Sequence, residues 1–243
     1  MIRSCEICGA EFITRPYLLK SGCGRYCSSV CFGKSRRRVY HVWDRPLTRA
    51  TAWAMGLMAS DGSVSKTNHV SLAVAPKDGA LCHQMRAIVD AGAIALYRNG
   101  ATQELLTWTV GSHHLAAQLR AYGLTETKSR TLPWPDIPAD VMADFLRGYW
   151  DGDGSLGTMR HSKSGIVYPV MQITSMSLDF MRGLVAYLQE ITQSRTRLLK
   201  TGRGYYQLFY GGKPAARLAG YLYADAPREC RLERKWKVAA TFA

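Results

Sequence analysis

Two short acidic turns are the stretches of this sequence whose residue types and spacing suit chemistry. "MASDGSV" (58–64) contains Asp61, "WDGDGSLG" (150–157) contains Asp151 and Asp153, and both include Asp-Gly-Ser. The repetition of an acidic turn needs a reason in a chain whose formal net charge is +14. Carboxylates that lie close together repel each other, so they bind a divalent cation such as Mg²⁺ or share a proton. The pair Asp61 and Asp153 therefore predicts a metal site.

A helix precedes each turn and must position its aspartate. Aligned on the aspartates, "AMGLMASDGS" (54–63) and "LRGYWDGDGS" (146–155) share Gly56 with Gly148. A second small residue follows four positions later, Ser60 in one copy and Gly152 in the other. Small residues at this spacing lie on one helix face and let two helix backbones approach closely.

We therefore expect the two helices to pack in parallel at Gly56 and Gly148. Both aspartates then lie at helix C-terminal ends, where the helix dipole disfavours a carboxylate. A cation between the two helices would offset this cost, and backbone carbonyls add further oxygen ligands. The predicted metal ligands are Asp61, Asp153, Ser60 and Gly152.

The elements around the turns occur in the same order twice, on either side of the break "LPWPDIP" (132–138). Periodicity predicts helices at 51–60, 78–92, 113–123, 140–150, 177–191 and 215–224. Alternation or apolar runs predict strands at 69–75, 105–111, 167–175, 194–200 and 205–211. The chain is thus an α+β protein with predicted domains at 1–43, 44–135 and 136–243, although a chance recurrence of this order is the alternative.

Composition favours a partner that is a polyanion. The chain has 32 lysine and arginine residues against 18 aspartate and glutamate residues, and 47% of it is hydrophobic. This indicates a folded protein that attracts nucleic acid, although a merely soluble basic surface is the simpler reading. No apolar run reaches the about 18 residues of a membrane span, and no signal peptide is evident. We expect a cytoplasmic (bacterial or phage) or organellar protein that is not secreted and does not enter a membrane.

Five of the seven cysteines lie in the first 31 residues. Cys5 with Cys8, and Cys27 with Cys31, have the spacing of a four-thiolate structural Zn²⁺ site. Cys23 is close enough to replace one of these ligands, and disulfides or redox chemistry are the alternative. The segment resembles a small treble-clef zinc finger, and basic residues follow it at once: Lys34, Arg36, Arg37 and Arg38.

The duplicated turns resemble the single-chain LAGLIDADG homing endonucleases, which carry two copies of the motif. Two ordinary Asp-Gly turns are the alternative. The resemblance covers roughly residues 45–243 and implies two pseudo-symmetric αββαββα repeats whose strands form a DNA-binding saddle. It implies a monomer that hydrolyses both strands of double-stranded DNA at a long target site. Mg²⁺ would support cleavage, and Ca²⁺ would replace it without cleavage.

The resemblance also implies roles for further residues. Lys128 and Lys235, near the end of each repeat, would be catalytic by stabilising developing negative charge, although solvated lysines are the alternative. Side chains on the strands would read or hold DNA in the major groove. The predicted DNA-binding residues are Arg36, Arg37, Arg38, Thr107, Thr109, Arg160, Lys163, Gln172, Arg195, Arg197, Tyr205 and Gln207.

Two other functions fit parts of the same sequence. The first is an RNA maturase or a DNA-binding regulator on the same fold that has lost cleavage; both aspartates are present, which argues against loss. The second is a metallonuclease with its chemistry in the finger, and this is disfavoured because the first histidine of the chain is His41.

Overall fold

The computed structural model describes residues 2–15, 18, 24–36, 40–44, 46–99, 103–202 and 204–242. The chain divides into two compact units, Met1–Tyr40 and His41–Ala243. In the first unit, β1 (Ile2–Ser4) and β2 (Glu11–Ile13) form an antiparallel hairpin, and α2 (Ser29–Arg36) follows. The predicted domain boundaries at residues 43 and 135 stay predictions.

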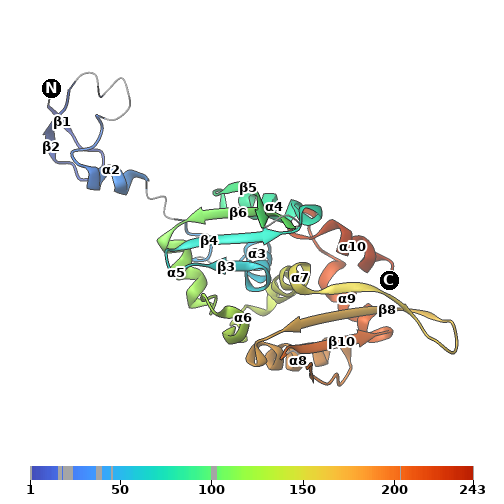
Figure 1. Ribbon diagram of the computed structural model, residues 1–243. Coiled ribbons are helices and arrows are strands. Elements are labelled where there is room, and N and C mark those ends of the chain that lie inside the picture. The colour runs from blue at the N-terminus through green and yellow to red at the C-terminus, as the bar shows by residue number, and fades with distance from the viewer. Residues whose placement is uncertain are drawn as a thin grey trace. The chain divides into compact units, whose positions relative to one another are not determined.

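The second unit contains the same series of elements twice (Figure 1). The first series is α3 (Arg49–Ser60), β3 (Gly62–Val64), β4 (His69–Val74), α4 (Ala80–Val89), β5 (Ala93–Asn99), β6 (Gln103–Gly111), α5 (His113–Ala121) and α6 (Lys128–Thr131). The second is α7 (Met142–Asp153), β7 (Ser155–Arg160), β8 (Val167–Ser175), α8 (Leu178–Thr192), β9 (Leu199–Lys200), β10 (Tyr206–Gly211), α9 (Lys213–Tyr223) and α10 (Glu233–Ala240). Short 3₁₀ turns lie at Pro76–Asp78, Ala139–Val141 and Arg228–Cys230.

Each series builds one four-stranded antiparallel sheet with the same strand order. The orders are β3-β4-β6-β5 and β7-β8-β10-β9. Helices α4 and α5 pack on the first sheet, and α8 and α9 on the second. The predicted mixed fold of two αββαββα repeats is confirmed.

Side-chain caps begin several helices where the sequence turns from extended to helical. Thr48 precedes α3 and forms a reciprocal capping box with Thr51. Ser112 caps α5 and Ser177 caps α8, each accepting from a backbone N–H of the first turn. A cap of this kind stabilises a helix by about 1 kcal/mol because it satisfies an otherwise unpaired donor.

Helices α3 and α7 pack against each other in the middle of the second unit, between the two sheets (Figure 1). A Cβ atom added at Gly56 would lie 1.9 Å from the carbonyl oxygen of Phe145. One added at Gly148 would lie 2.0 Å from the carbonyl oxygen of Trp53. Each glycine therefore faces the backbone of the other helix, as the spacing of small residues predicts.

The strands differ from the sequence-based expectation in two ways. The strand predicted over 194–200 is limited to β9, because this edge strand pairs with β10 at two residues only. Strands β3, β5 and β7 were not predicted from alternation. Both Leu96 and Tyr97 of the edge strand β5 are exposed, so β5 lacks the alternating burial that marks a strand with one covered face.

Gly148→Ala should destabilise the second unit, because the added methyl group meets a backbone atom that moves only if α3 moves. We expect a decrease of roughly 1–3 kcal/mol in the free energy of unfolding, measured by urea denaturation. Gly220→Ala in α9 is the matched control, since its added methyl meets nothing within 4 Å. That control should gain roughly 0.5–1 kcal/mol. Wild-type stability of Gly148→Ala would disprove the close approach of the two helices.

Candidate active site

The two aspartates of the acidic turns lie at the C-terminal ends of the packed helices. Asp61 is the residue that ends α3, and Asp153 is the last residue of α7. A Cβ atom added at Gly152 would lie 2.0 Å from Ser60 Oγ and 2.7 Å from Asp61 Oδ2. The Asp61 carboxylate therefore lies against the last turn of α7, in space that only a glycine at position 152 leaves open.

The electrostatics of the pair favour a bound cation or proton. Burial and, after it, the charge of Asp153 raise the pKa of Asp61 to about 6, against the opposing charges of Lys128 and Lys235. Asp153 is more exposed, yet desolvation by the surrounding protein raises its pKa as well, against the same two lysines. The surroundings of each carboxylate thus disfavour its negative charge. A bound divalent cation would offset this cost.

The two lysines predicted to be catalytic hold the ends of these helices. Lys128 Nζ donates to the carbonyl oxygens of Ala59 at 2.8 Å and Ser60 at 2.5 Å. Lys235 Nζ lies 2.6–3.2 Å from four carbonyl oxygens, those of Trp150, Asp151, Gly152 and Gly154, which share its three N–H donors. Both side chains are buried. Each therefore satisfies carbonyls that a helix C-terminus leaves unpaired and places a positive charge at the negative end of the helix dipole.

The predicted carbonyl ligands are the same groups that these lysines contact. The Ser60 carbonyl accepts from Lys128, and the Gly152 carbonyl accepts from Lys235. A carbonyl oxygen has two lone pairs, so one remains available to a cation at each position. Two carboxylates and two carbonyls form an all-oxygen donor set, which suits Mg²⁺ or Ca²⁺ better than a softer metal.

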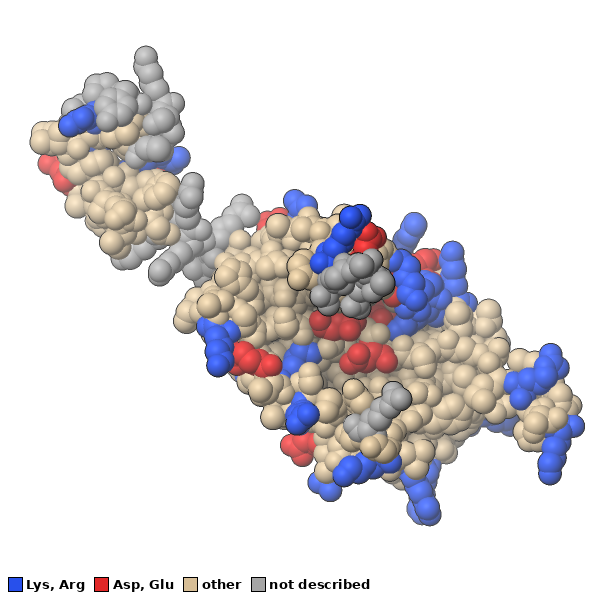
Figure 2. Space-filling view, viewed as in Figure 1, with Lys and Arg blue, Asp and Glu red and all other residues tan. Residues whose placement is uncertain are grey.

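A polar pocket of about 270 Å³ opens beside Asp153. Ser60 and Lys128 line it from the first repeat, and Tyr149, Thr174 and Tyr205 from the second. Tyr205, predicted from the sequence to contact DNA, is therefore brought to the same pocket as one aspartate. Figure 2 shows acidic side chains near the middle of this face of the second unit, with lysine and arginine side chains around them.

Most other predicted DNA-binding residues lie on the two sheets or at their margins. Thr107 and Thr109 alternate with the buried Trp108 and Val110, and Gln172 and Gln207 alternate with buried residues in the same way. Arg160 and Lys163 are exposed on the β7–β8 hairpin, whereas Arg195 and Arg197 are exposed in the irregular segment before β9. The side chain of Arg36 and all of Arg37 and Arg38 lie outside the described residues.

The family relationship agrees with this geometry. Residues 140–225, which span most of the second repeat, match the sequence model of the family described as LAGLIDADG-like domain. These residues are thus similar to a LAGLIDADG-like domain. No curated protein sequence matches the chain.

Solved LAGLIDADG proteins have a similar fold. One is the LAGLIDADG homing endonuclease I-LtrWI bound to target DNA, with a TM-score of 0.56 and 13% identity over 80% of this chain and 89% of that one. Another is the LAGLIDADG meganuclease I-AabMI bound to uncleaved DNA, with a TM-score of 0.54 and 16% identity over 79% and 88%. At these identities the likeness shows a shared fold. Among the described residues, every helix is too short or too polar to cross a membrane.

The first acid of the second LAGLIDADG motif, Asp151, has a role that sequence reasoning missed. Asp151 is 2% exposed and accepts from Trp53 Nε1 at 2.9 Å, Tyr223 Oη at 2.8 Å and the Leu232 backbone N–H at 3.0 Å. Trp53 belongs to α3, so this buried carboxylate joins the two repeats. The sequence does contain one indication of this role: Ala59 stands in the first copy where Asp151 stands in the second, so Asp151 cannot have the same function in both repeats.

A bidentate ion pair also crosses between the repeats. Arg234 donates to both carboxylate oxygens of Asp78 at 2.6 and 2.7 Å. Its guanidinium holds the pKa of Asp78 below the usual range. Together with Asp151, this pair fixes the orientation of the helix that carries Lys235.

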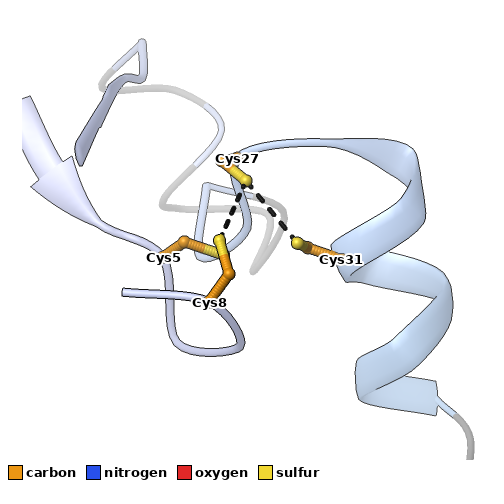
Figure 3. Close-up of side chains that lie close together, drawn as sticks. All are labelled: Cys5, Cys8, Cys27 and Cys31. Carbon is orange, nitrogen blue, oxygen red and sulfur yellow. Dashed lines mark hydrogen bonds between the residues drawn. The ribbon is translucent and has the colours of Figure 1, made fainter. Parts of the chain in front are cut away.

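The four N-terminal cysteines of the predicted zinc site converge within the first unit (Figure 3). Cys27 Sγ lies 3.6 Å from Cys8 Sγ and 3.6 Å from Cys31 Sγ, and all four sulfurs lie within 4.8 Å of one another. A zinc tetrahedron with bonds of about 2.3 Å has sulfur–sulfur edges of about 3.8 Å, so the cluster fits zinc. The alternative ligand Cys23 lies outside the described residues.

Two thiols of this cluster have shifted pKa values. Burial raises the pKa of Cys5, but backbone hydrogen bonds from Cys27, Cys8 and Ile7 outweigh it and lower the value to about 6. Hydrogen bonds to Cys31, Cys8 and Cys5 raise the pKa of Cys27 to about 12. A Cys5 thiolate beside a protonated Cys27 thiol is a starting point for metal binding with proton release.

Asp61→Asn should stabilise the metal-free protein in a pH-dependent way. Because folding raises the pKa of Asp61 from 3.8 to about 6, the ionised carboxylate lowers stability as pH rises through this interval, and the full penalty is present above it. The variant should gain roughly 1–3 kcal/mol at pH 7.5 and nothing at pH 3.5. Urea denaturation in EDTA measures both. The exposed Asp136→Asn should show no such gain, and a larger gain for Asp61→Asn at low pH would contradict the assignment.

Lys235→Met should destabilise the fold even without DNA or metal. Burial lowers the pKa of Lys235 to about 8, so at pH 7 the ammonium is still mostly charged and holds the α7 carbonyls. Removing these bonds should cost at least about 2 kcal/mol, measured by urea denaturation. Lys237→Met, exposed on the same helix, is the control and should be neutral. If both variants melt like the wild type, Lys235 does not stabilise the helix end.

Proposed function

We propose that this protein is a site-specific endonuclease that hydrolyses both strands of double-stranded DNA. The observation that carries the proposal is the packing of α3 and α7, which brings Asp61 to the last turn of the helix that ends in Asp153. The solved LAGLIDADG structures of similar fold are described as a homing endonuclease bound to target DNA and a meganuclease bound to uncleaved DNA. Their fold and the shared motif support the same substrate class for this chain.

We assign the divalent metal site to Asp61, Asp153 and the carbonyls of Ser60 and Gly152. When bound there, Mg²⁺ would activate water and stabilise the leaving oxygen of the phosphodiester. Lys128 and Lys235 hold the two helix ends rigidly, so that carboxylates and carbonyls keep their positions. We therefore infer that the lysines act chiefly as positioning residues, through the helix ends rather than through direct contact with phosphate.

The two sheets supply the surface for the DNA duplex. The outward side chains Thr107, Thr109, Gln172 and Gln207 present hydroxyl and amide groups, which suit hydrogen bonds to base edges. Arg160 and Lys163 on the β7–β8 hairpin, and Arg195 and Arg197 before β9, provide positive charge for phosphates. One chain contains both repeats, so a monomer is sufficient for a complete site.

The first unit is proposed to be a structural zinc finger that adds phosphate contacts. Cys5, Cys8, Cys27 and Cys31 would bind one Zn²⁺, and the basic run from Lys34 to Arg38 would contact the DNA backbone. A maturase or a regulator with the same fold is the competing function. It predicts nucleic-acid binding without any dependence of cutting on the two aspartates.

Cleavage of a specific DNA tests the endonuclease proposal. The substrate is DNA from the gene's own neighbourhood, joined across the presumed insertion point and incubated with Mg²⁺. A double-strand break should form at one site, whereas Ca²⁺ should support binding without cutting. Asp61→Asn and Asp153→Asn should each abolish the break and leave binding within a few-fold, because neither removes a positive charge. Asp136→Asn should cut like the wild type. Full cutting by either active-site variant would refute the site, and binding without cutting by the wild type would favour the regulator.

Removal of zinc tests the finger proposal. Zinc measured by elemental analysis should fall by one equivalent in Cys8→Ser, while the second unit melts as before. Deletion of residues 1–40 should weaken DNA binding and reduce its salt dependence by about 0.9 in log-log slope for each phosphate that the shortened chain no longer neutralises. The cut should stay where it is. A relocated cut would mean that the finger reads sequence, and unchanged zinc in Cys8→Ser would refute the ligand set.

A further inference from the structure

A second cluster of metal-ligating side chains lies at the start of the second unit. His41, Asp44 and His114 bring one ligand atom each to within 4.8 Å of one another. His41 Nδ1 lies 2.7 Å from Asp44 Oδ2, and His114 Nε2 contacts the same oxygen. None of these residues belongs to the aspartate pair or to the cysteine cluster.

The three side chains come from two rigid parts of the fold. His114 is in the first turn of α5. His41 and Asp44 flank Trp43, which is 4% exposed and donates from Nε1 to the Thr51 carbonyl at 3.1 Å. The segment is thus anchored by a buried tryptophan, so its ligands are held in place before any ion binds, which reduces the entropy cost of binding.

The two carboxylate oxygens of Asp44 have different neighbours, and Oδ2 is the one that faces both histidines. Gln118 donates from Nε2 to Oδ1, the other oxygen, and so orients the carboxylate. Gln118 is 8% exposed, and its own Oε1 has no hydrogen-bond partner among the residues that the structure describes. In metal sites, a carboxylate that binds the ion is commonly oriented by a hydrogen bond from a neighbouring group, and the buried Gln118 amide would do this here.

The two imidazoles both contact Asp44 Oδ2, and their rings are inclined to each other. Their ring centroids are 5.1 Å apart and the rings are inclined at 65°. Two neutral imidazole nitrogens and one carboxylate oxygen form the donor set of many zinc sites, with a fourth position open to water. This set favours zinc and other late first-row divalent ions over Mg²⁺, which prefers oxygen alone.

We propose that His41 Nδ1, Asp44 Oδ2 and His114 Nε2 bind a divalent transition metal, of which zinc is the preferred ion. The bound ion clamps residues 41–44 to helix α5. The clamp fixes the stretch of chain that directly follows the cysteine-bearing unit and leads into α3. A triad held by hydrogen bonds alone is the competing reading of the same contacts. The hydrogen-bonded triad differs from the proposed clamp because it would bind no metal.

Zinc content of the full chain tests the clamp. After metal loading and gel filtration, His41→Ala and His114→Ala should each hold one zinc equivalent fewer than the wild type. His113→Ala, the exposed neighbour on the same helix, should hold as many as the wild type. The cysteine site contributes the same zinc equivalent to all of these proteins. Cys8→Ser should lose that equivalent and keep the zinc of the clamp.

Cobalt spectroscopy separates the two sites. Co²⁺ bound by the clamp should lack the thiolate charge-transfer absorption of the cysteine site, and its signal should disappear in His41→Ala and in His114→Ala but not in Cys8→Ser. Zinc should also raise the melting temperature of the second unit in the wild type and in His113→Ala, but not in His41→Ala, whose half-exposed ring is not needed for folding. Equal zinc in the wild type and both histidine variants would overturn the proposal in favour of the hydrogen-bonded triad.

Discussion

The close packing of α3 against α7 is the constraint on which the rest of the second unit depends. Gly56 and Gly148 each face a backbone carbonyl of the opposite helix at a distance that no side chain permits. This packing brings the two helix ends, and with them the two carboxylates, to one place. It also sets the separation of the two sheets, because each sheet continues directly from one helix: β3 begins after Asp61 and β7 after Asp153. The proposed DNA surface and the proposed metal site are therefore positioned by the same pair of glycines.

Bringing two acids to two helix C-termini concentrates negative charge, and the fold offsets it locally. Lys128 and Lys235 come from the same place in each repeat and bind the terminal carbonyls of α3 and α7. Their charges stabilise the helix ends and lower the pKa of both aspartates, although desolvation still raises each value. Desolvation thus still disfavours both negative charges, and the proposed divalent ion would offset this cost.

The two repeats are similar in fold but differ in the buried polar contacts that they make at matching positions. Asp151 receives hydrogen bonds from Trp53, Tyr223 and the Leu232 backbone, whereas Ala59 at the matching position makes none of these bonds. Lys235 binds four carbonyls where Lys128 binds two. The buried polar contacts around the end of α7 are therefore more numerous than those around the end of α3.

The sequence by itself determined the elements whose pattern is local. Periodicity located α3 and α7, although both helices are buried on nearly all sides, and alternation located β4, β6, β8 and β10. The glycine spacing and the paired Asp-Gly turns identified the helix packing and both candidate metal acids. The cysteine spacing identified the four thiols that converge in the first unit.

Only the tertiary structure decided the contacts between residues far apart in the chain. Nothing local distinguishes Lys235 from Lys237 on α10, yet one is buried against α7 and the other is exposed. The role of Asp151 depends on Trp53 and Tyr223, and the approach of His114 to His41 and Asp44 depends on how α5 packs. The edge strands β5 and β9 likewise depend on their neighbours. Spacing along the chain encodes which face of one element is buried, but which charged groups meet is set by how separate elements pack together.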